Sequence, residues 1–160
     1  MKLKRSNPSV TIKRLRIQGY CNYSDAQLSN LASGNRISFI LCSIIVLTGV
    51  ITAGIPLLSI MMLIAFLGII LPNHPFDYIY NFGIRKLIGR PKLPPRSKQI
   101  KFACTIATVW LAGTITLFYI GFFLAGYIFG GILFLMAFTV STTDICIPSL
   151  LYNFMYKIKV

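Results

Sequence analysis

The sequence predicts an all-α protein that crosses a membrane several times, and two observations indicate this fold class. Of the 160 residues, 56% are hydrophobic and only 12% are charged. Charges are also missing from two long runs, residues 37–71 and 102–143. Each charge buried in hydrocarbon costs roughly 2.5 to 3.5 kcal/mol on insertion scales, so charge-free runs of this length are typical of membrane spans.

The first run divides into two predicted spans. The segment 53–56, Ala-Gly-Ile-Pro, interrupts the run near its middle with a turn and a proline that suits the first turn of a helix. We therefore predict spans over residues 37–52 and 57–71, near the short end of the roughly 17 to 25 residues that cross a bilayer. Whether this hairpin spans fully or is re-entrant stays open.

The second run divides at an aromatic and glycine cluster, residues 118–122, which gives spans over residues 102–118 and 122–143. Small residues at about four-residue spacing in the last span permit close helix approach. These residues are Gly121, Ala125, Gly126 and Gly130. They fit packing inside one bundle and a homodimer seam equally well.

The charges predict the orientation. The 16 Lys and Arg residues exceed the three acids, giving a net charge of +13, and lie in residues 1–36, 85–101 and 157–159. Both predicted hairpin turns lack charge, so the positive-inside rule places all three basic blocks and both termini in the cytoplasm. Basic segments at the cytoplasmic face are expected to bind anionic lipid headgroups there. A basic chain can also bind nucleic acid, but no zinc-finger or helix-turn-helix pattern is present, and we expect no nucleic-acid partner.

A short helix is predicted within the basic segment 1–36, before the first span. Ser24 as the N-cap and Gln27 three residues later form the pattern of a capping box. Gly34 is placed to end this helix.

Two helices are predicted to lie along the cytoplasmic surface of the membrane. In the loop 72–101, apolar residues at helical spacing predict an amphipathic helix over 75–88. The proline-rich stretch 90–96 then predicts a stiff basic connector. Near the carboxyl end, Pro148 separates the last span from an interfacial helix over 149–157.

A candidate polar cluster lies at the predicted cytoplasmic face and comprises His74, Asp77, Asp144 and Cys146. His74 and Asp77 are three residues apart at a helix start, which suits a capping arrangement. Asp144 suits an ion pair with Arg36. Metal binding by His74, Asp77 and Cys146 is chemically reasonable, although their spacing fits no standard motif. Packing and thiol chemistry both stay open for Cys146, and we expect no cofactor.

Two motifs are distinctive: residues 73–81, Asn-His-Pro-Phe-Asp-Tyr-Ile-Tyr-Asn, and residues 142–149, Thr-Thr-Asp-Ile-Cys-Ile-Pro-Ser. With them the chain resembles, over nearly its whole length, a family of small bacterial membrane proteins catalogued only as a domain of unknown function. The resemblance implies a protein of the bacterial cytoplasmic (inner) membrane with four spans. It supplies no reaction, substrate or catalytic residue.

Three functions are compatible with these features. The predicted spans hold no charge with which to bind or move an ionic substrate, which favours a non-enzymatic component of a membrane assembly, with itself or with a partner. The first alternative is a thiol- or metal-site protein that handles a sulfur species, a metal ion or electrons at the cytoplasmic face. The second is a small carrier for an uncharged solute.

Overall fold

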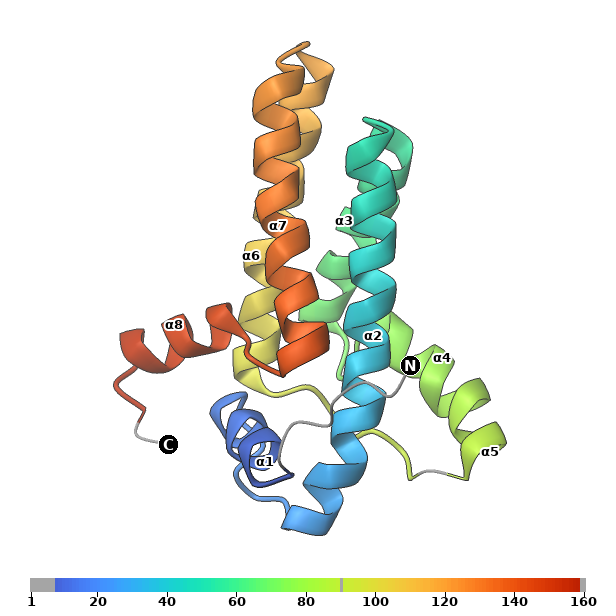
Figure 1. The fold of residues 1–160 in the computed structure, drawn as a ribbon, viewed down its shortest axis with the longest axis vertical. Helices are drawn as coiled ribbons and strands as arrows, with labels where there is room; N and C mark the ends of the chain where they lie inside the picture. Colours follow the sequence, from blue (N-terminus) through green and yellow to red (C-terminus); the bar gives the residue numbers. More distant parts are fainter. Residues whose placement is uncertain (1–7, 90, 159–160) are drawn as a thin grey trace.

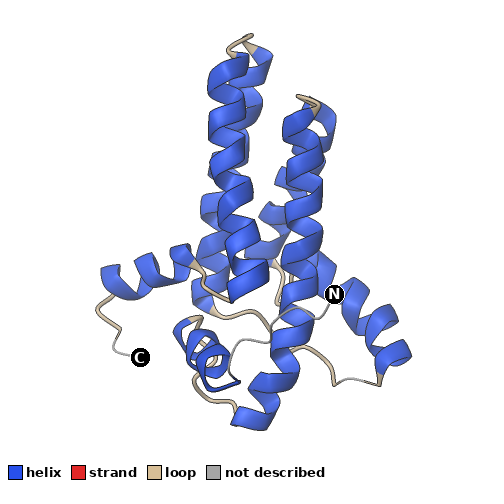
Figure 2. Cartoon of the chain, in the orientation of Figure 1, coloured by secondary structure: helices blue, strands red, loops and turns tan. Residues whose placement is uncertain are grey.

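The computed structural model describes residues 8–89 and 91–158, and the regular elements in these residues are all helices (Figure 2). The all-α class is therefore confirmed. Five members of the predicted basic blocks lie outside the described residues: Lys2, Lys4, Arg5, Arg90 and Lys159.

Four long helices stand side by side (Figure 1): α2 (Asp25–Ile51), α3 (Ile55–Ile70), α6 (Lys98–Tyr119) and α7 (Phe123–Thr143). The chain turns at 52–54 and at 120–122, and both turns lie at the same end of the group. Helix α2 packs mainly against α7, and α3 packs mainly against α6. The four helices therefore share one interior, although each turn joins only two of them.

Helix α2 is longer than predicted, because it includes the short helix expected before the first span. The predicted capping box is confirmed: Ser24 Oγ accepts from Gln27 N at 3.4 Å, and Gln27 Oε1 accepts from Ser24 N at 3.0 Å. The predicted helix end at Gly34 is wrong. A Cβ atom at Gly34 would lie 2.7 Å from Leu93 and 3.0 Å from Tyr80. This glycine therefore permits close packing inside a continuous helix.

Three helices, α2, α6 and α7, are each long and apolar enough to cross a membrane. Helix α3 meets the same test only together with the helical segment Pro75–Leu87, and the two are bent by 81° relative to each other. Within residues 8–89 and 91–158, the number of candidate spans rises to as many as four if this bent pair is one span. By length and composition, the chain is a multi-pass membrane protein.

The short helices gather at the end of the bundle opposite the two turns (Figure 1). They are α1 (Pro8–Ile17), α4 (Pro75–Ile79), the π-helix η1 (Tyr80–Ile84), α5 (Arg85–Ile88) and α8 (Ile147–Met155). The predicted amphipathic helix over 75–88 is thus three consecutive helical pieces, and Gly89, with φ +63°, caps the last one. Helix α8 begins two residues before its predicted start, with Pro148 in its first turn.

Two apolar cores hold these elements in place. One lies between the four long helices and includes Leu58, Leu111 and Leu133. The other lies at the base, where Leu15 of α1 and Leu28 of α2 are fully buried. The base core fixes α1 against the bundle and so positions the polar side chains described next.

Candidate functional site

Asp77 and Arg96 form a buried ion pair at the base of the bundle. The Arg96 guanidinium donates from Nε and Nη2 to the two carboxylate oxygens of Asp77. Ser38 Oγ donates to Asp77 Oδ1 at 2.6 Å, and the backbone N–H of His74 donates to Asp77 Oδ2 at 3.0 Å. The side chains of Arg96 and Asp77 are 4% and 0% exposed. A carboxylate offers about four acceptor positions, so Asp77 is fully engaged within the protein.

The electrostatics of this pair keep Asp77 ionised. Burial alone would raise the pKa of Asp77, but the Arg96 guanidinium and the hydrogen bonds from Arg96 and Ser38 outweigh burial, so the pKa is lowered. The guanidinium also lies over the ring of Phe39, 5.5 Å from its centroid. Asp77 is therefore a fixed negative charge whose counter-ion is part of the same fold.

His74 is the N-cap of α4, as the sequence predicted. Its Nδ1 accepts a hydrogen bond from the backbone N–H of Phe76 at 3.3 Å, while Asp77 accepts from the His74 N–H. Burial, followed by the nearby Arg96 cation, lowers the pKa of His74 to about 4, so the ring is neutral at pH 7. A neutral ring whose Nδ1 accepts holds its proton on Nε2, and the hydrogen-bond pattern assigns this tautomer.

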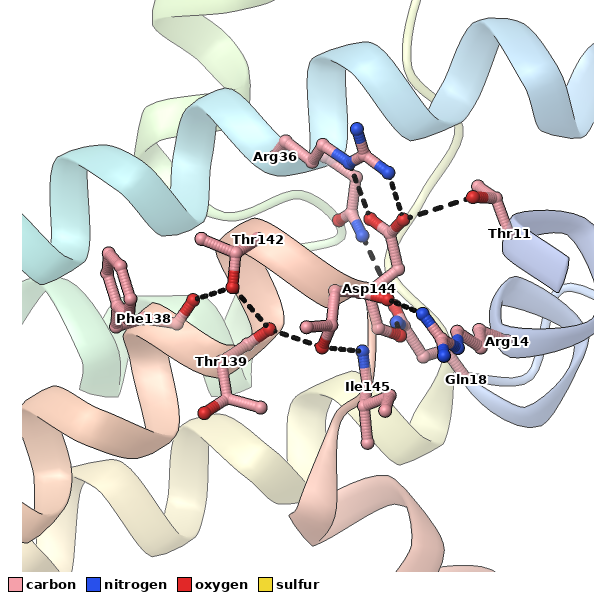
Figure 3. A network of polar contacts seen from close by, with 11 residues as sticks. Thr11, Arg14, Gln18, Arg36, Phe138, Thr139, Thr142, Asp144 and Ile145 are labelled. Carbon is pink, nitrogen blue, oxygen red and sulfur yellow. Dashed lines mark hydrogen bonds and ion pairs between the residues drawn. The ribbon is translucent and has the colours of Figure 1, made fainter. Parts of the chain in front are cut away.

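The second buried ion pair joins Asp144 to Arg36, which confirms the predicted pair (Figure 3). Arg36 Nε donates to Asp144 Oδ1 at 2.9 Å, and Thr11 Oγ1 of α1 donates to Oδ2 at 3.4 Å. Gln18 Nε2 donates to the backbone carbonyl of Asp144 at 2.7 Å. Asp144 caps α7 with a φ of +60°, so these contacts hold a strained backbone at the junction of α7 and α8.

A bridge of amides connects the two ion pairs. Asn35 Nδ2 donates to Gln18 Oε1 at 3.2 Å, and Arg96 Nη1 donates to Asn35 Oδ1. Gln18 is 0% exposed and Asn35 is 1% exposed. We call the connected set Asp77, Arg96, Asn35, Gln18 and Asp144 the basal network. It connects the residue that follows α1 with α2, α4, the loop before α6 and the end of α7.

The structure distributes the predicted polar cluster over two environments. His74 and Asp77 are in contact, and hydrogen bonds of the basal network connect them to Asp144. Cys146 lies outside that network, is 3% exposed and faces an apolar cavity. In the described residues, no three His, Cys, Asp or Glu side chains are placed to hold a metal ion, because the Asp77 oxygens face Arg96 and Ser38.

The small residues predicted to permit close helix approach lie in different surroundings. A Cβ atom at Gly126 would approach the Phe118 ring to 2.6 Å, and one at Gly130 would approach α2 to 2.5 Å. Both glycines are buried within the bundle, and Ala125 is half-buried. Gly121 lies in the turn at φ +83°, with no atom within 4 Å of the position of a Cβ. Gly126 and Gly130 therefore face neighbouring helices of the same chain.

Sequence reasoning missed three members of the basal network: Arg96, Asn35 and Gln18. The proline-rich stretch 90–96 predicts a stiff basic connector and indicates no partner for Arg96. The signal in the sequence is that the aromatic residues Phe76 and Tyr78 flank Asp77, because an acid in apolar surroundings needs a cation partner. No local pattern indicated which of the 16 basic residues would be that partner.

Comparison with known proteins identifies the family of the chain. No curated protein and no solved structure matches the chain. A family described as "Domain of unknown function (DUF4395)" matches residues 32–157, which include both buried ion pairs and the four long helices except the start of α2. The chain therefore belongs to the DUF4395 family of domains of unknown function.

Proposed function

We propose that this protein is a non-enzymatic component of a membrane assembly in the bacterial cytoplasmic membrane, with four spans arranged as two hairpins. Both termini and the basic loop between α3 and α6 lie in the cytoplasm. The observation on which the proposal depends is the basal network, because it engages the buried acids of the base within the fold.

The four-span topology is supported by the packing of α3. Its 16 residues are about 24 Å long at 1.5 Å per residue, somewhat short of a hydrocarbon core of about 30 Å. Helix α3 nevertheless packs along α6, which is itself long and apolar enough to cross a membrane. Both charge-free turns lie at one end and the basic segments at the other (Figure 1), as the positive-inside rule requires.

The non-enzymatic role is supported by the state of the polar groups. A general acid or base must reach a substrate proton, and a catalytic thiol needs a lowered pKa. Asp77 and Asp144 instead bind arginines of the same chain. Burial raises the pKa of Cys146, which is the opposite of thiol activation. The geometry therefore gives no support to the thiol- or metal-site alternative.

The outward face of α7 offers a surface for assembly. Gly131 has no atom within 4 Å of a Cβ position. Leu124, Ile128 and Leu135 are 76%, 57% and 59% exposed, and with Gly131 they follow a spacing of four, three and four residues. This spacing places them on one side of a helix, and a small residue at its centre permits a second helix to approach. We propose that this face contacts a second copy of the chain or a partner span.

Native mass spectrometry after gentle extraction tests the proposal. We expect a complex heavier than the 17.9 kDa monomer. The variant Gly131→Leu should dissociate this complex while the monomer unfolds at an unchanged denaturant concentration. Ala112→Leu, at an exposed position of α6, is the matched control and should leave the complex intact. A bare monomer from native membranes, or a complex that tolerates Gly131→Leu, would contradict the proposal.

A further inference from the structure

An apolar cavity of about 100 Å³ lies between the four long helices. Its walls come from α2, α3, α6 and α7, and its lower end lies beside the basal network. Among the residues that line it are Cys42, Met61, Cys104 and Met136. Packed interiors contain few voids larger than a water molecule, and a cavity of about 150 Å³ admits a molecule the size of benzene. This cavity therefore has room for a ligand of about four or five non-hydrogen atoms.

His74 provides a polar group at the lower end of the cavity. The residue is only 6% exposed, and its Nδ1 already accepts a hydrogen bond from the Phe76 N–H. The opposite ring edge, with Cδ2 and Nε2, lies over Gly68, where a Cβ would be 2.7 Å from Cδ2 and 3.2 Å from Cys104 Sγ. Among the described residues, Nε2 has no hydrogen-bond partner. A ligand acceptor at this ring edge would therefore gain a hydrogen bond without breaking one within the protein.

The same end of the cavity selects against ionic ligands. Arg96 lines the cavity, but the ion pair with Asp77 neutralises the charge of its guanidinium. A charged ligand would lose its hydration without gaining an unpaired counter-charge, which is unfavourable in an apolar site. An uncharged ligand with one acceptor, such as a carbonyl oxygen, avoids the cost of burying a charge and can accept a hydrogen bond from His74 Nε2.

We propose that this cavity is a binding site for a small, uncharged, mostly apolar molecule whose single hydrogen-bond acceptor binds the Nε2–H of His74. Such ligands partition into the bilayer and can reach a site among membrane helices. The proposal goes beyond the assembly function. It does not depend on assembly, because the cavity forms within one chain.

Methionine-methyl NMR provides a direct test in lipid nanodiscs. Met61 and Met136 line the cavity, whereas Met62 and Met155 do not and serve as internal controls. The probes are 2-butanone and 2-methyl-1-butene, which have the same shape and differ only in the carbonyl oxygen. We expect both probes to shift the Met61 and Met136 signals saturably and to leave the control signals nearly unchanged.

Two kinds of variant separate the cavity from the hydrogen bond. Ala107→Leu or Ala137→Leu fills the cavity from α6 or α7, and each should weaken both probes, whereas Ala112→Leu on the exposed face of α6 should weaken neither. His74→Phe should lower the preference for the ketone over the alkene about fivefold, the size of one net hydrogen bond. Comparing the ratio of the two probes' affinities between the wild type and His74→Phe cancels the different partitioning of the probes into lipid.

Three results would overturn the proposal. Equal shifts at all four methionines would show binding to the bilayer or the protein surface. Unchanged affinity in both cavity-filling variants would place the site elsewhere. An unchanged ketone preference in His74→Phe would show that the imidazole is not the donor.

Discussion

Replacing Arg96 by Met is expected to destabilise the protein by about 3 to 5 kcal/mol, the usual cost of removing one partner from a buried ion pair. The substitution leaves the Asp77 carboxylate, which is 0% exposed, with hydrogen bonds only from Ser38 and the His74 backbone. It also removes the donor to Asn35 Oδ1 and so breaks the link to the rest of the basal network. Methionine keeps much of the apolar stem of the arginine side chain. The loss of stability therefore reports mainly on the removal of the charge.

The free energy of unfolding can be measured by denaturant titration in mixed micelles, with tryptophan fluorescence as the signal. The matched control is Arg16→Met, which breaks an ion pair to Asp25 whose side chains are 44% and 67% exposed. That change should cost less than about 1 kcal/mol.

The double variant Arg96→Met with Asp77→Asn removes both charges and decides the interpretation. It should be more stable than the sum of the two single losses, because no unpaired carboxylate stays buried. Strict additivity, or an Arg96→Met loss no larger than that of Arg16→Met, would refute the claim that this pair locks the base.

Three further predictions concern the same region. Gly68→Ala should cost about 1 to 3 kcal/mol in the same titration, because its Cβ would lie 2.7 Å from His74 Cδ2. The pKa of His74 is about 4 when folded and ordinarily about 6.5, so the unfolded state binds more protons between these values, and stability should fall by up to about 3 kcal/mol as the pH falls through this window. His74→Leu should remove that loss, while the lowered pKa of Asp77 should leave a further loss below about pH 4. Exposed Cys21 should react with a soluble maleimide at least about tenfold faster than buried Cys146, as peptide mass spectrometry can measure; equal rates would contradict the burial of Cys146.

Much of the fold could be predicted because its determinants are local. The charge-free runs, the proline near the first turn and the glycine in the second turn indicate four long helices and the positions of both turns, although α2 and α6 begin before the runs do. The helix caps at Ser24 and His74 were also predictable, since each involves residues three apart in the chain. Gly34 misled the prediction because a glycine that permits tertiary packing and one that ends a helix look alike in sequence.

The candidate site was predicted only in part because its connections are distant in sequence. The pair of Arg36 and Asp144 could be proposed from the ends of two spans. The pairing of Asp77 with Arg96 depends on how the proline-rich loop folds under the bundle, and a periodic pattern does not contain that information. The amide bridge of Asn35 and Gln18 likewise exists only once α1 packs against α2.

The measurement that tests the central claim most directly is the side of the membrane from which single cysteines react with a membrane-impermeant maleimide. The set is native Cys21 alone, and Thr52→Cys or Phe122→Cys in a background without other cysteines, all at exposed positions. A four-span protein with a cytoplasmic base predicts labelling of Cys21 from the cytoplasmic side only, and of both turn positions from the opposite side only. Labelling of Thr52→Cys and Phe122→Cys from different sides, or of Cys21 from outside the cell, would contradict the account.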